Sequence, residues 1–126
     1  LATDAHPLAE VFLAYNAALN ALPALHYRQL RWDRPLPALG RFDVVIASDV
    51  LYERDHAELI AGLIERHILP QGEVMVTDPG RGNSARFGRL LAEQGFDVNA
   101  ERCPMSDNDP PPHRGRMLHF QRGAHA

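Results

Sequence analysis

The sequence has no lysine, a single cysteine and no long apolar run. All 13 basic residues are arginine, and the 16 acidic residues give a net charge of -3. Nucleic-acid-binding proteins usually carry a basic surface, so this charge argues against nucleic-acid binding. Cys103 has no second cysteine with which to form a disulfide, which fits a reducing, cytoplasmic location. No stretch approaches the roughly 20 apolar residues of a membrane span, so no membrane association is expected.

The residues that are present predict one domain. The chain has 126 residues, 45% of them hydrophobic, which is enough to bury a core. It opens directly into a domain-like pattern at Leu1, with neither an initiator methionine nor a signal peptide. We therefore expect the natural protein to extend upstream, and residues 1–126 to form part of one domain.

Strands and helices alternate along this domain. Helical spacing of apolar residues predicts helices near 7–22, 59–68 and 83–94, the first with an apolar stripe facing a core and an end at Pro23. Asn83 or Ser84 is expected to cap the third helix, and Gly95 to end it. Short apolar or alternating runs predict strands, and Pro- and Gly-rich stretches predict loops or turns. The strands are 1–4, 25–32, 42–47, 73–77, 97–105 and 116–121, and the loops or turns are 33–40, 70–72 and 106–114.

This alternation favours an α/β fold, a Rossmann-like three-layer sandwich with a mostly parallel sheet. The β-branched run 42–47 is typical of a strand covered on both faces. Only a loop separates the last two strands, and parallel neighbours need a longer crossover. The last strand is therefore expected to be antiparallel, a feature that most dinucleotide-binding Rossmann domains lack.

Polar residues follow three of the predicted strands, at the edge where open α/β sheets bind ligands. Asp4 is suited to accept hydrogen bonds from both ribose hydroxyls of a nucleoside, although it is equally suited to cap the next helix. Trp32 would flank a purine ring, and Asp33 would accept a hydrogen bond from the exocyclic amine of that purine. A tryptophan in the core is the favoured interpretation when the indole is taken alone. Asp49 and Tyr52 form a D-x-x-Y motif directly after 42–47; a capping acid and a packed tyrosine are the alternative.

These motifs resemble the class I, or seven-strand, S-adenosylmethionine-dependent methyltransferases. The D-x-x-Y motif points to the group of protein lysine methyltransferases related to nicotinamide N-methyltransferase. Val50-Leu51 departs from the D/N-P-P-Y/F motif of the adenine- and glutamine-modifying relatives, which argues against base methylation. The matching stretches are Asp4 with Pro7, Asn16 and Asn20; Leu30 to Asp33 (L-x-W and an acid); 42–52 (F-D-x-x-x-x-x-D-x-x-Y); 69–72 (K-P-G-G); and Gly95-Phe96 (G-F).

The resemblance implies S-adenosylmethionine as the cofactor and a protein lysine, or a similar amine, as the substrate. Asp4 would hold the ribose hydroxyls, Trp32 would pack beside the adenine and Ser48 would line the cofactor pocket. Asp49 and Tyr52 would face the methyl group and the incoming amine. The seven histidines are scattered without a recognised ligand spacing, so no metal site is expected.

The glycine-rich loop of the family, G-x-G-x-G, and the strand before it are absent from this chain. Gly80-Arg81-Gly82 lies too late in the sequence to replace that loop. The missing strand occupies the middle of the family's sheet, so its absence leaves two half-sheets with unpaired inner edges. We expect upstream sequence or another chain to supply this strand, and residues 1–126 to be the C-terminal two-thirds of the domain.

Other functions are compatible with the same residues. A small-molecule N-methyltransferase would use the same scaffold, and a non-catalytic methyltransferase-like binding subunit would explain the missing loop. A nicotinamide-dependent dehydrogenase is disfavoured by the antiparallel last strand and the D-x-x-Y motif. Asp107 and Asp109 in the loop 106–114 would suit a cationic substrate, but a solvated loop is the favoured interpretation.

Overall fold

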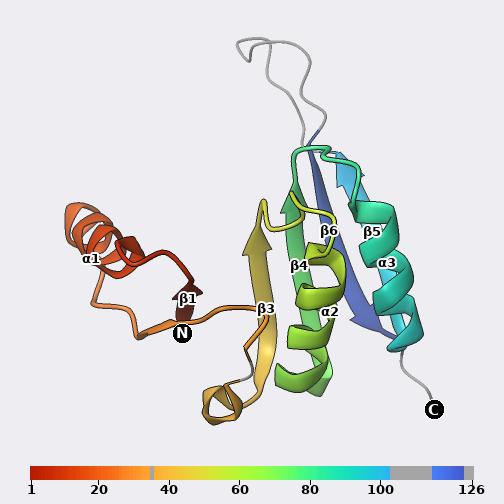
Figure 1. The fold of residues 1–126 in the computed structure, drawn as a ribbon, viewed down its shortest axis with the longest axis horizontal. Coiled ribbons are helices and arrows are strands. Elements are labelled where there is room, and N and C mark those ends of the chain that lie inside the picture. The colour runs from red at the N-terminus through yellow and green to blue at the C-terminus, as the bar shows by residue number, and fades with distance from the viewer. Residues whose placement is uncertain (35, 103–114, 124–126) are drawn as a thin grey trace. The chain divides into compact units, whose positions relative to one another are not determined.

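The computed structural model describes residues 1–34, 36–102 and 115–123, which fall into two compact units. The first unit covers residues 1–37 and the second residues 38–126. Figure 1 shows the alternation of strands and helices that the sequence predicts. The strand end predicted at 103–105, the loop 106–114 with Asp107 and Asp109, and the tail 124–126 lie outside the described residues.

The first unit is a strand–helix–strand motif. β1 (Ala2–Asp4) pairs in parallel with β2 (Tyr27–Gln29), and α1 (Ala9–Leu19) connects the two strands. The helix ends at Leu19, earlier than the predicted end at Pro23, because Ala21 takes a left-handed conformation with φ of 54°. β2 is shorter than the strand predicted over 25–32.

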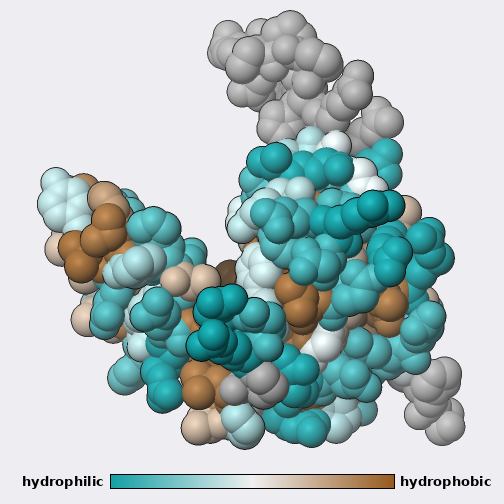
Figure 2. All heavy atoms as spheres, viewed as in Figure 1, coloured by the Kyte–Doolittle hydropathy of each residue, from teal (hydrophilic) through white to brown (hydrophobic). Residues whose placement is uncertain are grey.

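The apolar stripe of the α1 region does not face a core within its unit, so that prediction was wrong. A unit of this size, with a two-stranded sheet and one helix, has too little structure to enclose the stripe. Figure 2 shows hydrophobic side chains on the surface of this helix. The exposed fractions run from 52% to 66% for Leu8, Val11, Phe12, Tyr15, Leu19 and Leu22.

The second unit is a four-stranded sheet of order β3-β4-β6-β5. β3 and β4 are parallel, whereas β6 is antiparallel to both β4 and β5. Among the described strands of this sheet, β6 alone runs opposite to the shared direction of β3, β4 and β5, as predicted for the last strand. The elements are η1 (Pro37–Leu39), a short 3-10 helix in the predicted loop 33–40, β3 (Phe42–Ser48), α2 (His56–His67), β4 (Ile68–Asp78), α3 (Ser84–Glu93), β5 (Phe96–Arg102) and β6 (Arg116–Arg122).

The core of this unit lies between one face of the sheet and the two helices α2 and α3, which cover that face (Figure 1). Successive side chains of a strand point to opposite faces, so alternate residues of β4 and β6 enter the core. At its centre the Phe87 and Phe120 rings meet edge to face, with centroids 5.3 Å apart. The buried residues include Ile60, Ile64, Val74, Val76, Phe87, Leu91, Leu118 and Phe120.

The opposite face of β3 is uncovered within this unit. Val44 is 50% exposed and Ile46 is 75% exposed, so the prediction that both faces of this strand are covered was wrong here. β3 is also an edge strand, because β4 is its one partner among the described strands. The described strands therefore form two separate sheets, as expected for half-sheets with unpaired inner edges.

The two ends of α3 test the predicted caps. Gly95 follows the C-cap Gln94 with φ of 88°, a left-handed conformation that glycine adopts without strain, so it ends the helix as predicted. Asn83 occupies the N-cap position but makes no capping hydrogen bond with its side chain. Its Nδ2 instead donates to the carbonyl oxygen of Leu51 at 2.8 Å, which ties the loop before α3 to the loop after β3.

β4 runs unbroken through residues 70–72, where the sequence predicts a turn. The register between β3 and β4 shifts in this region: Phe42 pairs with Ile68, and Val44 pairs with Glu73. The extra residues of β4 are absorbed as an irregularity in the strand instead of a turn. Gly72 lies in this irregularity, where an added Cβ would meet Ile68 Cδ1 at 2.5 Å and the Leu69 carbonyl oxygen at 3.0 Å.

Gly72→Ala is therefore expected to lower the free energy of unfolding by about 1–3 kcal/mol, the usual cost of overpacking. Ile68 is 1% exposed and has little space into which to move. Gly62→Ala is the matched control, because a Cβ in that position of α2 meets Arg66 Nη1 at an ordinary 3.5 Å. Urea unfolding should show the control to be stabilised by roughly 0.5–1 kcal/mol. Equal stability of the Gly72 variant and the wild type would contradict this account.

Candidate functional site

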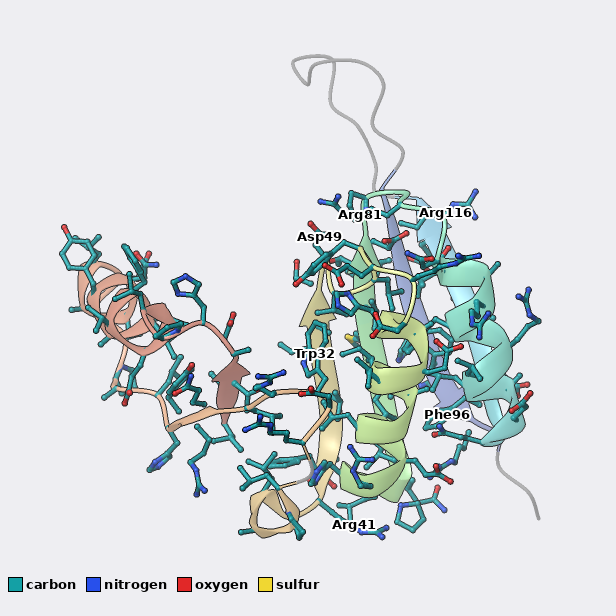
Figure 3. The ribbon with its side chains drawn as sticks, in the orientation of Figure 1. Trp32, Arg41, Asp49, Arg81, Phe96 and Arg116 are labelled. Atoms are coloured by element: carbon teal, nitrogen blue, oxygen red, sulfur yellow. The ribbon has the colours of Figure 1, made fainter. Side chains whose placement is uncertain are left out.

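Polar groups from three strands meet at the carboxyl edge of the parallel pair β3–β4. Ser48 pairs with Thr77 at the ends of these strands, so the residues that follow them come together. Figure 3 shows Asp49, Arg81 and Arg116 at this end of the sheet. A cavity of about 190 Å³ lies there, lined by Ser48, Asp49, Thr77, Asp78, Pro79, Gly115 and Arg116.

Arg81, from the loop between β4 and α3, forms a bidentate ion pair with the carboxylate of Asp49. Its Nε donates to Oδ1 at 2.6 Å and its Nη2 donates to Oδ2 at 2.8 Å. These hydrogen bonds lower the pKa of Asp49 below its ordinary value. Asp49 is consequently an ionised acceptor at neutral pH and a poor general base. Its favourable contribution to folding is complete above the ordinary pKa and is lost as the pH falls through the lowered one.

The backbone on both sides of this contact is unusual. Asp49 has φ of 52°, in the left-handed region that few residues other than glycine, asparagine and aspartate adopt. Its N–H donates to the Thr77 carbonyl oxygen at 2.9 Å, which anchors it to the end of β4. Gly80 and Gly82 flank Arg81 with φ of 98° and 90°, so both loops bend to bring the two side chains together.

Tyr52 joins the same group through Arg81 and His56. The Arg81 Cζ lies 6.0 Å from the centroid of the Tyr52 ring, at the outer limit of a cation–π contact. The ring packs edge-on against the buried His56, with centroids 4.4 Å apart. The Tyr52 side of the group is open, because this residue is 52% exposed. The structure thus links the acid and the phenol of the D-x-x-Y motif through an arginine.

Ser48 lines the cavity beside Asp49. Its Oγ accepts a hydrogen bond from the Thr77 Oγ1 at 3.0 Å, so two hydroxyl groups stand side by side at the ends of β3 and β4. Ser48 and Asp49 are therefore together, with Tyr52 reached through Arg81, in the second unit. The other predicted site residues lie in the first unit.

Asp4 ends β1 and does not cap the helix that follows. The N-cap of α1 is Leu8, whereas Asp4 Oδ1 accepts a hydrogen bond from the His6 N–H at 2.8 Å. An ionised carboxylate has about four acceptor positions, so this single bond leaves capacity for a pair of hydroxyl groups. This geometry removes the capping alternative and is compatible with ribose binding.

Trp32 and Asp33 follow β2, whose end lies beside the end of β1. Asp4 pairs with Gln29, and the Leu30 N–H donates to the Asp4 carbonyl oxygen at 3.0 Å. Trp32 is half-buried. The Asp33 carboxylate accepts from the Arg31 Nε at 3.0 Å and from its Nη2 at 2.8 Å, which lowers the pKa of Asp33. Asp33 is thus an ionised hydrogen-bond acceptor, and Arg31 already uses some of its acceptor positions.

Sequence reasoning missed Arg81, Thr77, Asp78 and Arg116. The available signal was positional: in a parallel pair, residues after one strand meet residues after its neighbour. Asp78 is 4% exposed, its Oδ2 accepts from the Gly80 N–H at 3.2 Å, and its buried Oδ1 has no hydrogen-bond partner. Asp78 pairs with Arg116 at the start of β6, which adds a cation to the cavity lining.

A group of potential metal ligands lies next to Tyr52. Glu53, Asp55 and His56 bring ligand atoms within 4.8 Å of one another. His56 Nδ1 already accepts the Glu53 N–H at 3.1 Å, so this nitrogen is used in the loop itself. We assign no metal to the group. Among the described residues, no helix combines the length and the apolar character needed to cross a membrane.

Comparison with solved structures establishes the fold. The ribosomal protein L11 methylase of Lactobacillus delbrueckii subsp. bulgaricus matches 95% of this chain with a TM-score of 0.68 and 20% identity. The precorrin-6y C5,15-methyltransferase of Geobacter metallireducens matches 96% of it with a TM-score of 0.70 and 11% identity. The methyltransferase domain of bacterial CtHen1-C matches 97% of it with a TM-score of 0.72 and 13% identity. The fold is therefore the Rossmann-like fold of S-adenosylmethionine-dependent methyltransferases.

The profile of the lysine methyltransferase family matches residues 1–91, and the chain belongs to this family. S-adenosylmethionine is the methyl donor that the family and the fold imply. The chain spans 55% of the L11 methylase, 65% of the precorrin enzyme and 76% of the CtHen1-C domain. The first two proteins thus have at least a third of their length beyond the matched region.

The residues present fit this cofactor in their chemistry. Asp4 has acceptor capacity for ribose hydroxyls, and Trp32 and Asp33 offer an aromatic ring and an acceptor for a purine. The cavity beside Ser48 and Asp49, at about 190 Å³, is smaller than the 300 Å³ or more that encloses a ligand of this size.

Proposed function

We propose that the protein transfers a methyl group from S-adenosylmethionine to an amine nitrogen, that of a protein lysine. The observation that carries the proposal is the group of Asp49, Tyr52 and Arg81 beside the cavity at the carboxyl edge of β3 and β4. Ligands of open α/β sheets bind at this edge. Membership of the lysine methyltransferase family supports an amine acceptor.

The cofactor supplies a methyl group bonded to a positively charged sulfur. The amine lone pair forms the N–CH₃ bond as the CH₃–S bond breaks, and the electron pair of that bond stays on sulfur. A lysine ammonium must release one proton to solvent before this step, and the neutral amine becomes a methylammonium as it takes the methyl group. The chain's own contribution is to place the amine in line with this bond, because orientation supplies much of the rate in such a displacement.

Asp49 and Tyr52 are the residues we assign to the amine. The ionised Asp49 carboxylate would accept a hydrogen bond from the amine N–H and so orient the nitrogen lone pair. Tyr52 would hydrogen-bond the amine or line the site. Asp4, Trp32, Asp33 and Ser48 are proposed to bind the cofactor in the roles described above. Asp49 is not assigned as a base, because the Arg81 hydrogen bonds lower its pKa.

The openness of the site supports a protein substrate. The Asp49 and Arg81 side chains are 43% and 48% exposed, and Tyr52 is 52% exposed. A side chain presented by another protein can reach such a surface, whereas a small molecule usually needs a more enclosing pocket. A small-molecule amine remains the second candidate. The presence of Asp4, Asp49 and Tyr52 weighs against a non-catalytic binding subunit.

We also propose that residues 1–126 are the C-terminal two-thirds of the catalytic domain and act in the cytoplasm. The free edge of β3 would pair with a strand from upstream sequence or from another chain. That strand would bring the glycine-rich loop that this chain lacks.

The proposal is tested by incubating the protein, with whatever natural sequence precedes Leu1, with methyl-labelled S-adenosylmethionine and two acceptor pools. One pool is a dialysed protein extract, and the other is the small-molecule fraction removed by dialysis. We expect label in protein, released as methyllysine after acid hydrolysis. Label in the small-molecule fraction alone would favour the second candidate, and label in neither pool would contradict methyl transfer.

A further inference from the structure

Arg81 hydrogen-bonds Asp49 and lies near the Tyr52 ring, the two residues proposed to face the amine, yet the sequence motif does not include it. Its guanidinium binds both oxygens of Asp49 and lies beside the Tyr52 ring. A carboxylate proposed to meet a substrate amine is thus already paired with a cation of the protein itself. The physical consequence of this pairing concerns the protonation state of the amine.

An unpaired carboxylate would oppose the reaction that it is meant to assist. A nearby negative charge stabilises the protonated form of an amine. A protonated amine has no lone pair with which to form the new N–CH₃ bond. A carboxylate that both orients the amine and leaves it neutral must therefore have its own charge compensated.

We propose that Arg81 is a positioning residue that neutralises Asp49, so that the site orients a neutral amine instead of holding an ammonium ion. This inference rests on the proposed methyl transfer to an amine. It extends that function by assigning the form of the substrate that the site selects.

The geometry allows Arg81 and the amine to share Asp49. Each carboxylate oxygen offers about two acceptor positions, and the guanidinium fork uses one on each oxygen. The remaining positions can accept an amine N–H while Arg81 stays bound. The Asp49–Arg81 pair is also partly exposed, at 43% and 48%, so a substrate can approach it from solvent.

The fold holds Arg81 in this place by several independent contacts. The flanking Gly80 and Gly82 have φ of 98° and 90°, which the loop needs in order to turn Arg81 toward β3. The Asn83 side chain donates to the Leu51 carbonyl oxygen at 2.8 Å and so joins the two loops. The left-handed backbone of Asp49, anchored to Thr77, completes the arrangement.

The other charged and titratable groups around Asp49 do not replace Arg81. Arg116 of β6 lines the same cavity, but it lies opposite Asp78, whose negative charge also acts on Arg81. His56 packs against Tyr52 and interacts with Glu53. Among the described residues, Arg81 is the cation that hydrogen-bonds the Asp49 carboxylate. The charged and titratable groups near Asp49 are Tyr52, Glu53 and His56 after β3, Asp78 of β4, Arg81 and Arg116.

The test uses two ligands that differ at one group. S-adenosylhomocysteine has no methyl group, and its amine analogue carries a C–NH₂ group where S-adenosylmethionine carries S–CH₃. The affinity ratio of the two ligands reports how strongly the site favours a cationic amine at the position of the transferred methyl group. Calorimetric titrations at pH 7, on this chain with whatever natural sequence precedes Leu1, give the ratio without knowledge of the substrate.

In Arg81→Gln we expect the amine analogue to bind roughly fivefold tighter relative to S-adenosylhomocysteine, the size of a partly exposed charge interaction. Methyl transfer should fall at pH 7 in the same variant and recover partly as the pH rises, because a higher pH restores the neutral amine. A merely structural role of Arg81 would weaken both ligands together and leave the pH profile unchanged. Adding Asp49→Asn to this variant should return the affinity ratio to the wild-type value.

Two controls complete the test. Arg86→Gln removes a comparably exposed arginine from its ion pair with Glu58, away from the site, and should leave both readouts unchanged. Arg81→Lys keeps the positive charge but loses the bidentate guanidinium geometry. It should keep the wild-type affinity ratio of the two ligands, even if Arg81→Gln folds poorly. An unchanged ratio in a folded Arg81→Gln variant that binds S-adenosylhomocysteine would overturn this inference alone. A wild-type protein that binds neither ligand would overturn the proposed function, and this inference with it.

Discussion

Asp49→Asn is expected to slow methyl transfer roughly 100-fold, the usual cost of a misplaced nucleophile. The asparagine amide keeps the size of the side chain but replaces one acceptor oxygen with an NH₂ donor. That donor would face the guanidinium N–H groups of Arg81, which now hydrogen-bond two carboxylate oxygens at 2.6 and 2.8 Å. The amine would then lose its oriented acceptor. Initial rates with labelled S-adenosylmethionine give the effect.

The binding of S-adenosylhomocysteine separates this effect from general damage. We expect its affinity in Asp49→Asn to stay within about threefold of wild type, because the pair with Arg81 is a partly exposed contact of modest strength. Tyr52→Phe removes the phenol oxygen and keeps the ring against His56. It should also slow transfer if the hydroxyl hydrogen-bonds the amine. Full turnover in both variants with cofactor bound would contradict the assigned roles.

Phe120→Ala is expected to lower the free energy of unfolding by about 3–5 kcal/mol, the range for deleting a buried aromatic ring. Phe120 is 1% exposed, and its ring meets Phe87 edge to face at the centre of the core between the sheet and α3. The substitution removes this contact and leaves a cavity that neighbouring side chains of the two helices fill only in part. Urea unfolding followed by circular dichroism measures the loss.

Met117→Ala is the matched control on the same strand. Met117 is 40% exposed and points to the face of β6 opposite Phe120, away from α2 and α3. Its replacement should change the free energy of unfolding by about 0.5 kcal/mol or less. If both substitutions cost the same, the core does not lie on the helix side of the sheet as described.

Local sequence patterns were sufficient for most of the fold. The helical spacing of apolar residues predicted α2 and α3, because these helices bury their apolar sides against one face of the sheet. The loop between the last strands gave the antiparallel β6, since a chain that short cannot cross over. Patterns of this kind depend on local geometry and need no knowledge of distant residues.

The errors share a physical cause, which is dependence on distant parts of the chain. Residues 70–72 looked like a turn, but pairing of Ile68 with Phe42 extends β4 through them. The runs on β3 and α1 looked like core, but burial depends on which elements are present to cover them. Asn83 looked like a helix cap, but a tertiary hydrogen bond to Leu51 takes its side chain.

The candidate site divides in the same way. Asp49 and Tyr52 were recognisable because they follow a buried strand within one motif. Arg81 was not, because its pairing with Asp49 joins residues 32 positions apart and depends on the neighbouring positions of β3 and β4. Asp78 and Arg116 were missed for the same reason, since they meet through the β4–β6 pairing.

The most direct test of the central claim is a calorimetric titration of S-adenosylhomocysteine into this chain expressed with whatever natural sequence precedes Leu1, beside an Asp4→Ala variant. Asp4 ends β1, one of its oxygens accepts the His6 N–H, and its remaining acceptor capacity is assigned to ribose. We predict binding by the wild type, and a loss of about 100-fold or more in the variant, as for removal of a charged hydrogen-bonding partner. No binding by the longer wild-type protein, or equal binding by the two proteins, would contradict the proposed cofactor site.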